Sequence, residues 1–305
     1  MNEDNVACNS LRAWVLAARP KTLTAAAVPV MTGVALHEAA GWVALDAVPV
    51  VLCFLFAFVL QIDANFVNDY FDFLKGTDGE ERLGPRRACA QGWVTLSAMR
   101  RAIVLTTLLG CAVGLPLILY GGWEMIGVGA ACIVFCFLYT TCLSYLGLGD
   151  VLVVLFFGLV PVCATYYVCA PEGAQTLTLS VVWVSLAVGL VVDALLIVNN
   201  YRDIDNDRQA GKRTLVVRLG KNASEWLYLL TGYGACAVFF LLFIRSAWTA
   251  AVLPLLYLLP HTQTWREMRR IARGRALNRV LGLTARNIFL FGLLAALGLL
   301  LGGTV

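Results

Sequence analysis

Two polar stretches interrupt an otherwise apolar sequence, and they carry residue types that bind metal ions and phosphates. They are ANFVNDYFDFLKGTDGEERLGPRR at 64–87 and NNYRDIDNDRQAGKRTLVVRLG at 199–220. Asn68 and Asp72 in the first are four residues apart, and so are Asp203 and Asp207 in the second. On a helix this spacing puts both oxygen donors on one face. The matching order of residues in the two stretches indicates a weak internal repeat.

Each of these pairs is followed by cations, which are Arg82 and Arg86 in the first stretch and Lys212 and Arg213 in the second. Mg²⁺ prefers oxygen ligands and binds one or two carboxylates together with substrate phosphates. Two such ions, with these cations, would neutralise a diphosphate and make it a leaving group. The pattern therefore predicts a site that holds metal ions against a diphosphate. An allylic prenyl diphosphate bound there would ionise toward a carbocation, which an electron-rich aromatic ring captures.

The predicted metal ligands are Asn68, Asp72, Asp203 and Asp207, and the last three are also the predicted catalytic residues. Other polar candidates are Asn65, Asp69, Asp78, Asn199, Asn200 and two acids inside apolar runs, Asp63 and Asp193. An ionisable residue within a membrane span is a functional candidate, although a hydrogen-bonded neutral carboxyl is an alternative. Aromatic residues that would shield the carbocation are Tyr70, Tyr139, Tyr145 and Tyr166, with Phe66, Phe71 and Tyr167.

The composition predicts an all-α integral membrane protein. The 305 residues are 60% apolar and 14% charged, and the mean hydropathy is +0.79. Apolar runs near the roughly 20 residues that cross a bilayer predict about nine helices. Their predicted ranges are 22–39, 46–67, 99–120, 122–143, 148–170, 179–200, 224–244, 247–263 and 285–302. No linker divides the chain, which predicts one transmembrane domain over 1–305 with a polar tail at 1–11.

The sequence does not favour a zinc site, a redox site or a nucleic-acid-binding site. The ten cysteines form no C-x-x-C pair, and the two histidines, His37 and His261, are far apart. A zinc or redox site is therefore not expected. No basic patch interleaved with aromatic residues indicates nucleic-acid binding.

The basic residues predict the orientation of the helices. Of the 23 Lys and Arg residues, all but Arg245 fall in four segments that nine spans would place on one side. The positive-inside rule makes that side cytoplasmic, which predicts an N-in, C-out topology. Both acidic stretches then lie at the cytoplasmic membrane boundary, where a charged head group docks while its tail stays in lipid. The basic run 266–279 is interpreted as a solvated amphipathic loop.

At these residues the sequence resembles the UbiA-type intramembrane aromatic prenyltransferases. It is similar in particular to the 1,4-dihydroxy-2-naphthoate polyprenyltransferases of menaquinone synthesis. The resemblance runs through ARPKTL at 18–23, NDYFD at 68–72, YLGLGD at 145–150, LFFGLVPV at 155–162, TYYV at 165–168 and VNNYRDIDND at 198–207. The two acidic stretches carry the family resemblance, and the other segments favour the naphthoate branch.

The resemblance implies a nine-helix bundle around a central cavity that opens laterally to membrane lipid. It implies two Mg²⁺ ions held by the four predicted ligands, and it adds Lys21 to the diphosphate contacts. The partners would be a polyprenyl diphosphate and 1,4-dihydroxy-2-naphthoate, joined with loss of CO₂ to give demethylmenaquinol. The first stretch departs from the family pattern, with Gly76 at the last acidic position and Asp78 two residues later.

Three alternatives remain open on the sequence. One is prenylation of another aromatic acid, such as 4-hydroxybenzoate. Another is a polytopic transporter whose acidic residues couple ions, although such residues are expected near the midplane of the membrane. The third is a non-catalytic lipid-binding subunit of an assembly.

Overall fold

The chain folds into a bundle of helices. The structure is a computed structural model that describes residues 6–41, 45–76, 82–143 and 146–302, and these contain no strand. The helices are α1 (Leu11–Ala18), α2 (Leu23–Ala39), α3 (Ala47–Leu74), α4 (Leu96–Gly114), α5 (Ile118–Gly121), α6 (Glu124–Leu138), α7 (Gly149–Val154), α8 (Val160–Cys169), α9 (Leu179–Arg202), α10 (Ile204–Gln209), α11 (Leu215–Phe243), α12 (Trp248–Val252), α13 (Leu258–Ile271) and α14 (Leu277–Leu301). The connecting turns η1 (Pro20–Thr22), η2 (Leu115–Leu117) and η5 (Leu253–Tyr257) are 3₁₀-helical, and η3 (Tyr139–Leu143) and η4 (Leu155–Leu159) are π-helical.

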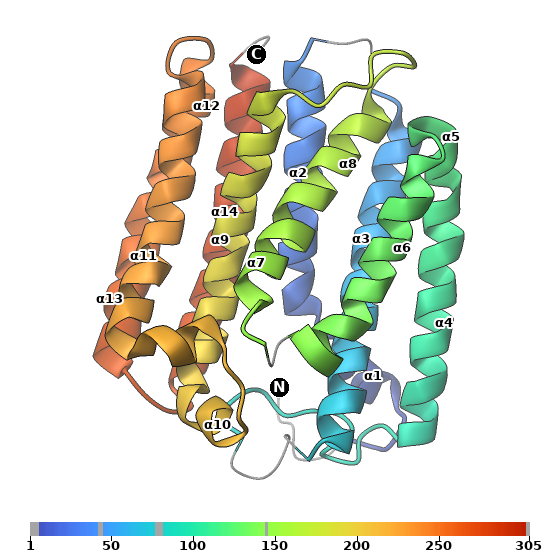
Figure 1. The fold of residues 1–305 in the computed structure, drawn as a ribbon, viewed down its shortest axis with the longest axis vertical. Helices are drawn as coiled ribbons and strands as arrows, with labels where there is room; N and C mark the ends of the chain where they lie inside the picture. Colours follow the sequence, from blue (N-terminus) through green and yellow to red (C-terminus); the bar gives the residue numbers. More distant parts are fainter. Residues whose placement is uncertain (1–5, 42–44, 77–81, 144–145, 303–305) are drawn as a thin grey trace.

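Seven helices among the described residues are long and apolar enough to cross a membrane. They are Ala47–Leu74, Leu96–Gly121, Glu124–Thr141, Gly149–Cys169, Leu179–Arg202, Leu215–Phe243 and Leu277–Leu301. Helix α2 and the broken segment α12–η5–α13 run alongside them (Figure 1). The predicted all-α membrane fold is confirmed. The count of nine crossings and the N-in, C-out orientation stay predictions.

Local sequence sets where the helices begin. Asp46 caps α3 by accepting a hydrogen bond from the Val48 amide at 2.9 Å. Thr178 and Thr214 cap α9 and α11 in the same way, through the amides of Val181 and Val217. Such side chains satisfy amides that have no partner within the helix. The large apolar residues on the outer surface, including Leu105, Leu119 and Leu241, suit contact with lipid.

Helix α3 continues beyond the predicted end at residue 67, and this extension carries Asn68 and Asp72 on its last turns. A polar end is compatible with the helix because Asp69 bonds to backbone amides of the next loop. The 266–279 run was also wrongly interpreted as a loop. Helix α13 continues to Ile271, and Glu267 forms ion pairs with Arg270 at 3.6 Å and Arg279 at 3.3 Å.

The chain from α7 to α8 packs closely against α9 because two glycines meet there. A Cβ on Gly158 would lie 2.5 Å from the Cα of Gly189, so a side chain at this position would separate the two helices. This contact brings the beginning of α7 beside the second half of α9, where a Cβ on Gly149 would lie 3.3 Å from the Leu196 side chain.

Candidate active site

The first acidic stretch is a helix end attached to a loop. Asp69 accepts hydrogen bonds from the backbone amides of Ala88 and Cys89, both at 2.9 Å. The neighbouring Asp72 forms an ion pair with Arg87 at 3.4 Å. The chain at 87–89 thus folds back over the end of α3 and places a guanidinium on the acidic pair.

Asn68 lies on the same face of α3 as Asp72 and contacts the hydroxyl of Thr140, at the end of the α6 span. Lys75, just past α3, donates to the backbone oxygens of Thr140 at 3.1 Å and Thr141 at 2.9 Å. These contacts hold the end of α3 against the π-helical turn η3. The oxygens of Asn68 and Asp72 that could bind a metal ion therefore lie on a helix end that is held in place by these contacts.

The second acidic stretch is built around the buried guanidinium of Arg202. This side chain is 1% exposed and donates to both carboxylate oxygens of Asp203, at 2.8 and 2.6 Å. It also donates to the side-chain oxygens of Asn199 and Asn278, both at 2.8 Å. Because carboxylate oxygens each carry two lone pairs, Asp203 still has acceptor capacity toward the cavity.

Asp207 follows one turn later, and the helical hydrogen bond from its amide to the Asp203 carbonyl is kept at 2.8 Å. Its carboxylate lies 3.7 Å from the ammonium of Lys212. Burial raises the pKa of Asp207 to about 6, with a further increase from Asp203, whereas Lys212 and Arg202 oppose the rise. A bound cation would favour the ionised form of this carboxyl.

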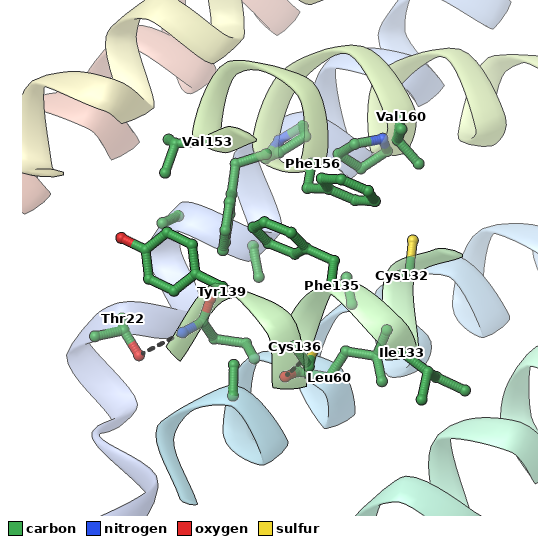
Figure 2. Close-up of a pocket in the computed structure, with 18 of the residues that line it drawn as sticks. Thr22, Leu60, Cys132, Ile133, Phe135, Cys136, Tyr139, Val153, Phe156 and Val160 are labelled. Atoms are coloured by element: carbon green, nitrogen blue, oxygen red, sulfur yellow. Dashed lines mark hydrogen bonds between the residues drawn. The ribbon is translucent and has the colours of Figure 1, made fainter. Parts of the chain in front are cut away.

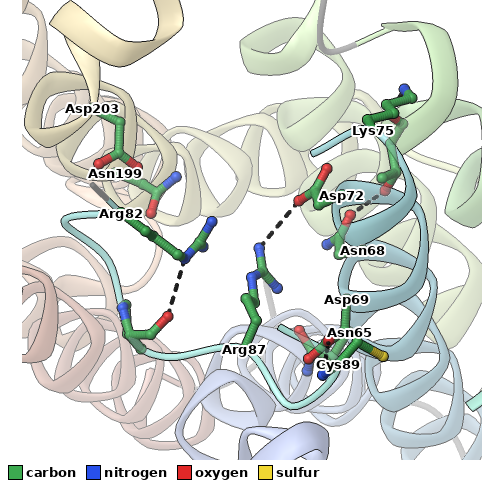
Figure 3. A network of polar contacts seen from close by, with 12 residues as sticks. Asn65, Asn68, Asp69, Asp72, Lys75, Arg82, Arg87, Cys89, Asn199 and Asp203 are labelled. Carbon is green, nitrogen blue, oxygen red and sulfur yellow. Dashed lines mark hydrogen bonds and ion pairs between the residues drawn. The ribbon is translucent and has the colours of Figure 1, made fainter. Parts of the chain in front are cut away.

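The loop between α3 and α4 joins the two acidic stretches. Asn278 of α14 is bonded to Arg202 and also donates to the Leu83 carbonyl at 2.8 Å. A Cβ on Gly84 would lie 2.7 Å from the Arg202 guanidinium, so the loop can approach only with glycine there. Figure 3 shows Asn199 and Asp203 on one side and Asn68 and Asp72 on the other, with guanidinium groups between them.

Both stretches line one cavity of about 750 Å³. Its polar wall consists of Arg19, Asn68, Asp72, Arg82, Arg87, Asn199, Asn200, Asp203, Asp207 and Lys212. The rest of the lining is mostly apolar and comes from α2, α3, α4, α6, α8 and α9. Tyr139 lines the cavity, as do Phe135 and Phe156, whose stacked rings have centroids 4.1 Å apart (Figure 2).

The donor set fits Mg²⁺. The cavity offers carboxylate and amide oxygens from two helix ends. Within the described ranges, no three His, Cys, Asp or Glu residues come close enough together to hold a metal ion by themselves. An ion at this site would therefore share its coordination between protein oxygens, water and substrate phosphates, as Mg²⁺ commonly does.

Of the predicted site residues, the structure brings a compact subset to the cavity. These are Asn68, Asp72, Arg82, Asn199, Asn200, Asp203, Asp207, Lys212 and Tyr139. The lining does not include Lys21, Arg86, Arg213, Asn65, Asp69, Asp63, Asp193, Tyr70 and Tyr166. Asp78 and Tyr145 lie outside the described residues.

Several of the predicted residues outside the lining have a structural role. Asp63 is buried and accepts from Thr106 at 2.5 Å and Thr107 at 2.8 Å, which joins α3 to α4. Asn65 donates to the Ala18 carbonyl and the Thr22 hydroxyl, both at 2.9 Å, which joins α3 to the N-terminal segment.

Some of the predicted diphosphate contacts and some of the predicted aromatic residues also lie outside the cavity lining. Lys21, Arg86 and Arg213 are exposed at the surface. Tyr70 stacks edge-on with Phe71 beside a separate apolar cluster, and Tyr166 is buried in the main core.

Three arginines in or beside the polar wall were missed by the sequence prediction, namely Arg19, Arg87 and Arg202. Arg202 lies within the second acidic stretch, so its position next to Asp203 was an available signal. Arg19 has a left-handed backbone conformation, with φ 51°, at the turn between α1 and η1. Neither it nor Arg87 is marked by a periodic pattern in the sequence.

Known proteins resemble the chain along most of its length. A protein from Escherichia coli (strain K12) named 1,4-dihydroxy-2-naphthoate octaprenyltransferase is 36% identical over 304 residues, which cover 95% of this chain and 96% of the relative. A Mycobacterium leprae (strain TN) protein of the same name is 35% identical, covering 97% and 99%. The UbiA prenyltransferase domain-containing protein 1 homolog of Drosophila melanogaster is 30% identical, covering 93% and 78%.

Solved structures share the fold. The apo structure of a UbiA homolog from Aeropyrum pernix K1 superposes with a TM-score of 0.67 at 18% identity, covering 90% of this chain and 96% of that one. A UbiA homolog from Archaeoglobus fulgidus bound to GPP and Mg²⁺ superposes with a TM-score of 0.62 at 11% identity, covering 93% and 99%. The family model described as UbiA prenyltransferase family matches residues 26–285. The chain therefore belongs to the UbiA prenyltransferase family.

Proposed function

We propose that this protein transfers a polyprenyl group from a polyprenyl diphosphate to 1,4-dihydroxy-2-naphthoate, with loss of CO₂, to give demethylmenaquinol. The observation that carries this proposal is the single cavity in which two acidic helix ends and several cations meet an apolar chamber. The acceptor is inferred from the relatives that are 35–37% identical and named 1,4-dihydroxy-2-naphthoate octaprenyltransferase.

The charged wall binds and orients the diphosphate. Arg82, Arg87 and Lys212 line the cavity between the two acidic stretches, where their positive charges attract phosphate oxygens. Guanidinium groups can bind two such oxygens at once, which fixes the orientation of the leaving group. As the C–O bond breaks, these cations stabilise the negative charge that develops on the diphosphate.

Mg²⁺ fits the oxygen donors of Asn68, Asp72, Asp203 and Asp207, and we assign two ions to this site because the donors come from two separate helix ends. When bound, Mg²⁺ supplies additional positive charge at the leaving diphosphate. In the structure of the Archaeoglobus fulgidus homolog, GPP and Mg²⁺ are bound together.

The apolar part of the cavity holds the prenyl chain and protects the reacting carbon from water. Phe135, Tyr139 and Phe156 present aromatic rings there, and such rings stabilise a cation within about 6 Å of their centroids. Because most of the lining is apolar, water is disfavoured and premature hydrolysis of the allylic cation is reduced.

The position of the charged residues supports a single domain in the cytoplasmic membrane with its active site on the cytoplasmic side. Helices α1 and α10 lie at the same end of the bundle (Figure 1), and Arg19, Asp207 and Lys212 of the polar wall lie in or just after these helices. The positive-inside rule associates such an end with the cytoplasm.

The test is an assay of the purified protein in liposomes with a polyprenyl diphosphate and either Mg²⁺ or EDTA. Naphthoate labelled at its carboxylate, and 4-hydroxybenzoate in parallel, report acceptor choice and CO₂ release. We expect Mg²⁺-dependent prenylation of the naphthoate with stoichiometric CO₂. Turnover of the benzoate alone would contradict the acceptor, and no transfer to either by folded protein would contradict the function and favour transport.

A further inference from the structure

A second, much smaller cavity adjoins the main one. Its volume is about 20 Å³, and it is lined by Tyr139, Gly149, Asp150, Asn200 and Thr214. Three of these residues, Tyr139, Asn200 and Thr214, also line the main cavity. A cavity needs roughly 10–15 Å³ to admit one water-sized group. This one therefore has room for a single hydroxyl of a molecule that occupies the main cavity.

The side chain of Asp150, in the first turn of α7, is buried without a hydrogen-bond partner among the described residues. It is 6% exposed, and neither of its carboxylate oxygens has a hydrogen-bond partner among the described residues. Asp193 of α9 is 4% exposed, and its Oδ1 atom also lacks a hydrogen-bond partner among the described residues. A buried polar group without a partner costs about 1–3 kcal/mol, so the pair requires an explanation.

The surroundings of Asp150 suit a hydroxyl and not a phosphate. The lining of the small cavity contains no Lys or Arg, whereas the cations of the site line the main cavity. A carboxylate in this lining repels diphosphate oxygens, and its lone pairs accept hydrogen bonds from O–H groups.

The small cavity also lies at the right place for the reaction. A Cβ on Gly149 would lie 3.7 Å from the Tyr139 hydroxyl, so this aromatic residue of the main cavity stands beside the start of α7. Tyr139 is followed by Thr140, which contacts Asn68 of the first acidic stretch. Asn200 follows Asn199 of the second stretch. The small cavity thus borders both walls of the diphosphate site.

Resting on the proposed function, we infer that Asp150 is a catalytic residue that binds the acceptor's ring hydroxyl next to the carboxylate-bearing carbon and takes its proton during prenyl transfer. Asp193, the second buried carboxyl, is a positioning residue that acts on Asp150 through its charge. Tyr139 and Asn200 form the sides of the hydroxyl pocket.

The chemical step balances without an oxidant or reductant. The ring carbon that bears the carboxylate bonds to C1 of the prenyl group, and the C–O bond to diphosphate breaks with its electron pair leaving on the diphosphate. The neighbouring hydroxyl becomes a carbonyl as its proton passes to Asp150. The bond to the carboxylate then breaks, CO₂ leaves, and the electron pair returns through the ring to the oxygen. That oxygen recovers the proton from Asp150, and the aromatic diol is restored.

The direct test compares Asp150→Asn with wild type in liposomes at saturating prenyl diphosphate and Mg²⁺. Because a general base contributes about 10²–10⁴-fold, we expect kcat to fall by that factor. Binding of prenyl diphosphate, measured calorimetrically without acceptor, should change less than about twofold, since it does not involve the small cavity. Asp46→Asn is the matched control, because Asn also caps helices and this position is at the far end of α3.

Two further comparisons separate recognition from a general effect on folding. Gly149→Ala keeps every charge but puts a methyl group into the small cavity, and we expect a higher acceptor KM with unchanged diphosphate binding. An acceptor methylated on the hydroxyl next to the carboxylate should be a poor substrate of wild type. In the Asp150→Asn variant, methylation of this hydroxyl should cause little further loss of activity, because the carboxylate that contacts the hydroxyl in wild type is already absent.

These experiments distinguish failure of the inference about Asp150 from failure of the proposed function. If wild type does not prenylate the naphthoate, the proposed function fails. If wild type is active and Asp150→Asn keeps its kcat and acceptor KM, the inference is overturned and the small cavity holds only a structural water. A raised acceptor KM with an unchanged kcat would leave hydroxyl binding but overturn the proton transfer. Asp193→Asn should alter the pH profile of kcat more than diphosphate binding, and an unchanged profile would remove its role.

Discussion

The two acidic helix ends have similar sequences, but they hold their carboxylates in different ways. On α3, Asp72 forms an ion pair of 3.4 Å with Arg87, which comes from the loop that follows this helix. On α9, Asp203 is bonded twice by the adjacent Arg202, which is itself fixed by two asparagines. The second carboxylate is therefore preorganised by its own helix. The first depends on a loop whose guanidinium also lines the cavity, where it can contact a phosphate.

The largest expected effect is common to both helix ends. Replacing either carboxylate, as Asp72→Asn or Asp203→Asn, removes an oxygen donor for the cation on the diphosphate. We expect kcat to fall about 100- to 1,000-fold, the usual cost of removing one preorganised electrostatic group. Asp205→Asn is the control, since this α10 side chain is 65% exposed and pairs with Arg208 at the surface. A variant at either cavity position with wild-type kcat would remove that residue from the site.

The next prediction compares how much the arginine at each helix end contributes to the free energy of unfolding. Arg202→Met leaves Asp203 without its buried partner, which should lower the free energy of unfolding by about 3–5 kcal/mol. Arg87→Met removes the longer ion pair of 3.4 Å with Asp72 and should cost less. Denaturation in detergent, followed by intrinsic fluorescence, measures both. Equal losses of stability would show that the two carboxylates are held alike.

Prenyl diphosphate affinity should depend more on Arg87 than on Arg202, which is the reverse of the order expected for stability. Because Arg87 lines the cavity, Arg87→Lys should weaken prenyl diphosphate binding about 10- to 100-fold, the equivalent of one charge-assisted contact of about 1.5–3 kcal/mol. The protein should remain folded, since a positive charge is still next to Asp72. Calorimetric titration in the presence of Mg²⁺ provides the measurement. Wild-type affinity would mean that Arg87 serves only the fold.

Metal removal tests whether the two ends act through one ion-dependent site. A ligand that binds only the folded state raises the apparent stability, by about 2.7 kcal/mol at 100 times its Kd. We expect prenyl diphosphate to raise the melting temperature in Mg²⁺ and to lose this effect in EDTA. The same stabilisation in EDTA would contradict a bridging cation. Pyrophosphate alone serves as the probe that lacks a lipid tail.

The smallest expected effect distinguishes two neighbours. The sequence predicts both Lys212 and Arg213 as diphosphate contacts, but only Lys212 is among the described cavity-lining residues, and Arg213 is exposed. Lys212→Ala should lower kcat/KM about 10-fold or more, and Arg213→Ala less than about threefold. Equal losses would restore Arg213 to the site.

Much of this arrangement could be predicted from the sequence because apolar runs and i, i+4 carboxylates leave clear patterns. The spacing predicts that Asn68 and Asp72 share one helix face and that Asp203 and Asp207 share another, and the structure places all four in the lining of one cavity. The extension of α3 past residue 67 was missed because hydropathy falls where the helix becomes polar. The loop contacts that sustain it, from Asp69 to Ala88 and Cys89, join residues distant in sequence.

Contacts between residues distant in sequence also explain why some charged residues were assigned the wrong role. Asp63 and Asp69 are as conspicuous in the sequence as Asp72, yet they bond to threonines and to loop amides. Arg87 was counted only as a basic loop residue, because its pairing with Asp72 depends on how the loop folds back. Tertiary contacts, and not residue types, decide which of these groups face the cavity.

The most direct test of the account is a double-mutant cycle across the cavity. Prenyl diphosphate affinity in Mg²⁺ is measured by calorimetry for wild type, Asp72→Asn, Asp203→Asn and the double variant. If both helix ends hold one metal–diphosphate complex, the second substitution should add little to the loss caused by the first, which is a coupling of about 0.5–3 kcal/mol. Two losses that simply add would mean that the helix ends act independently, and the account of a shared site would be wrong.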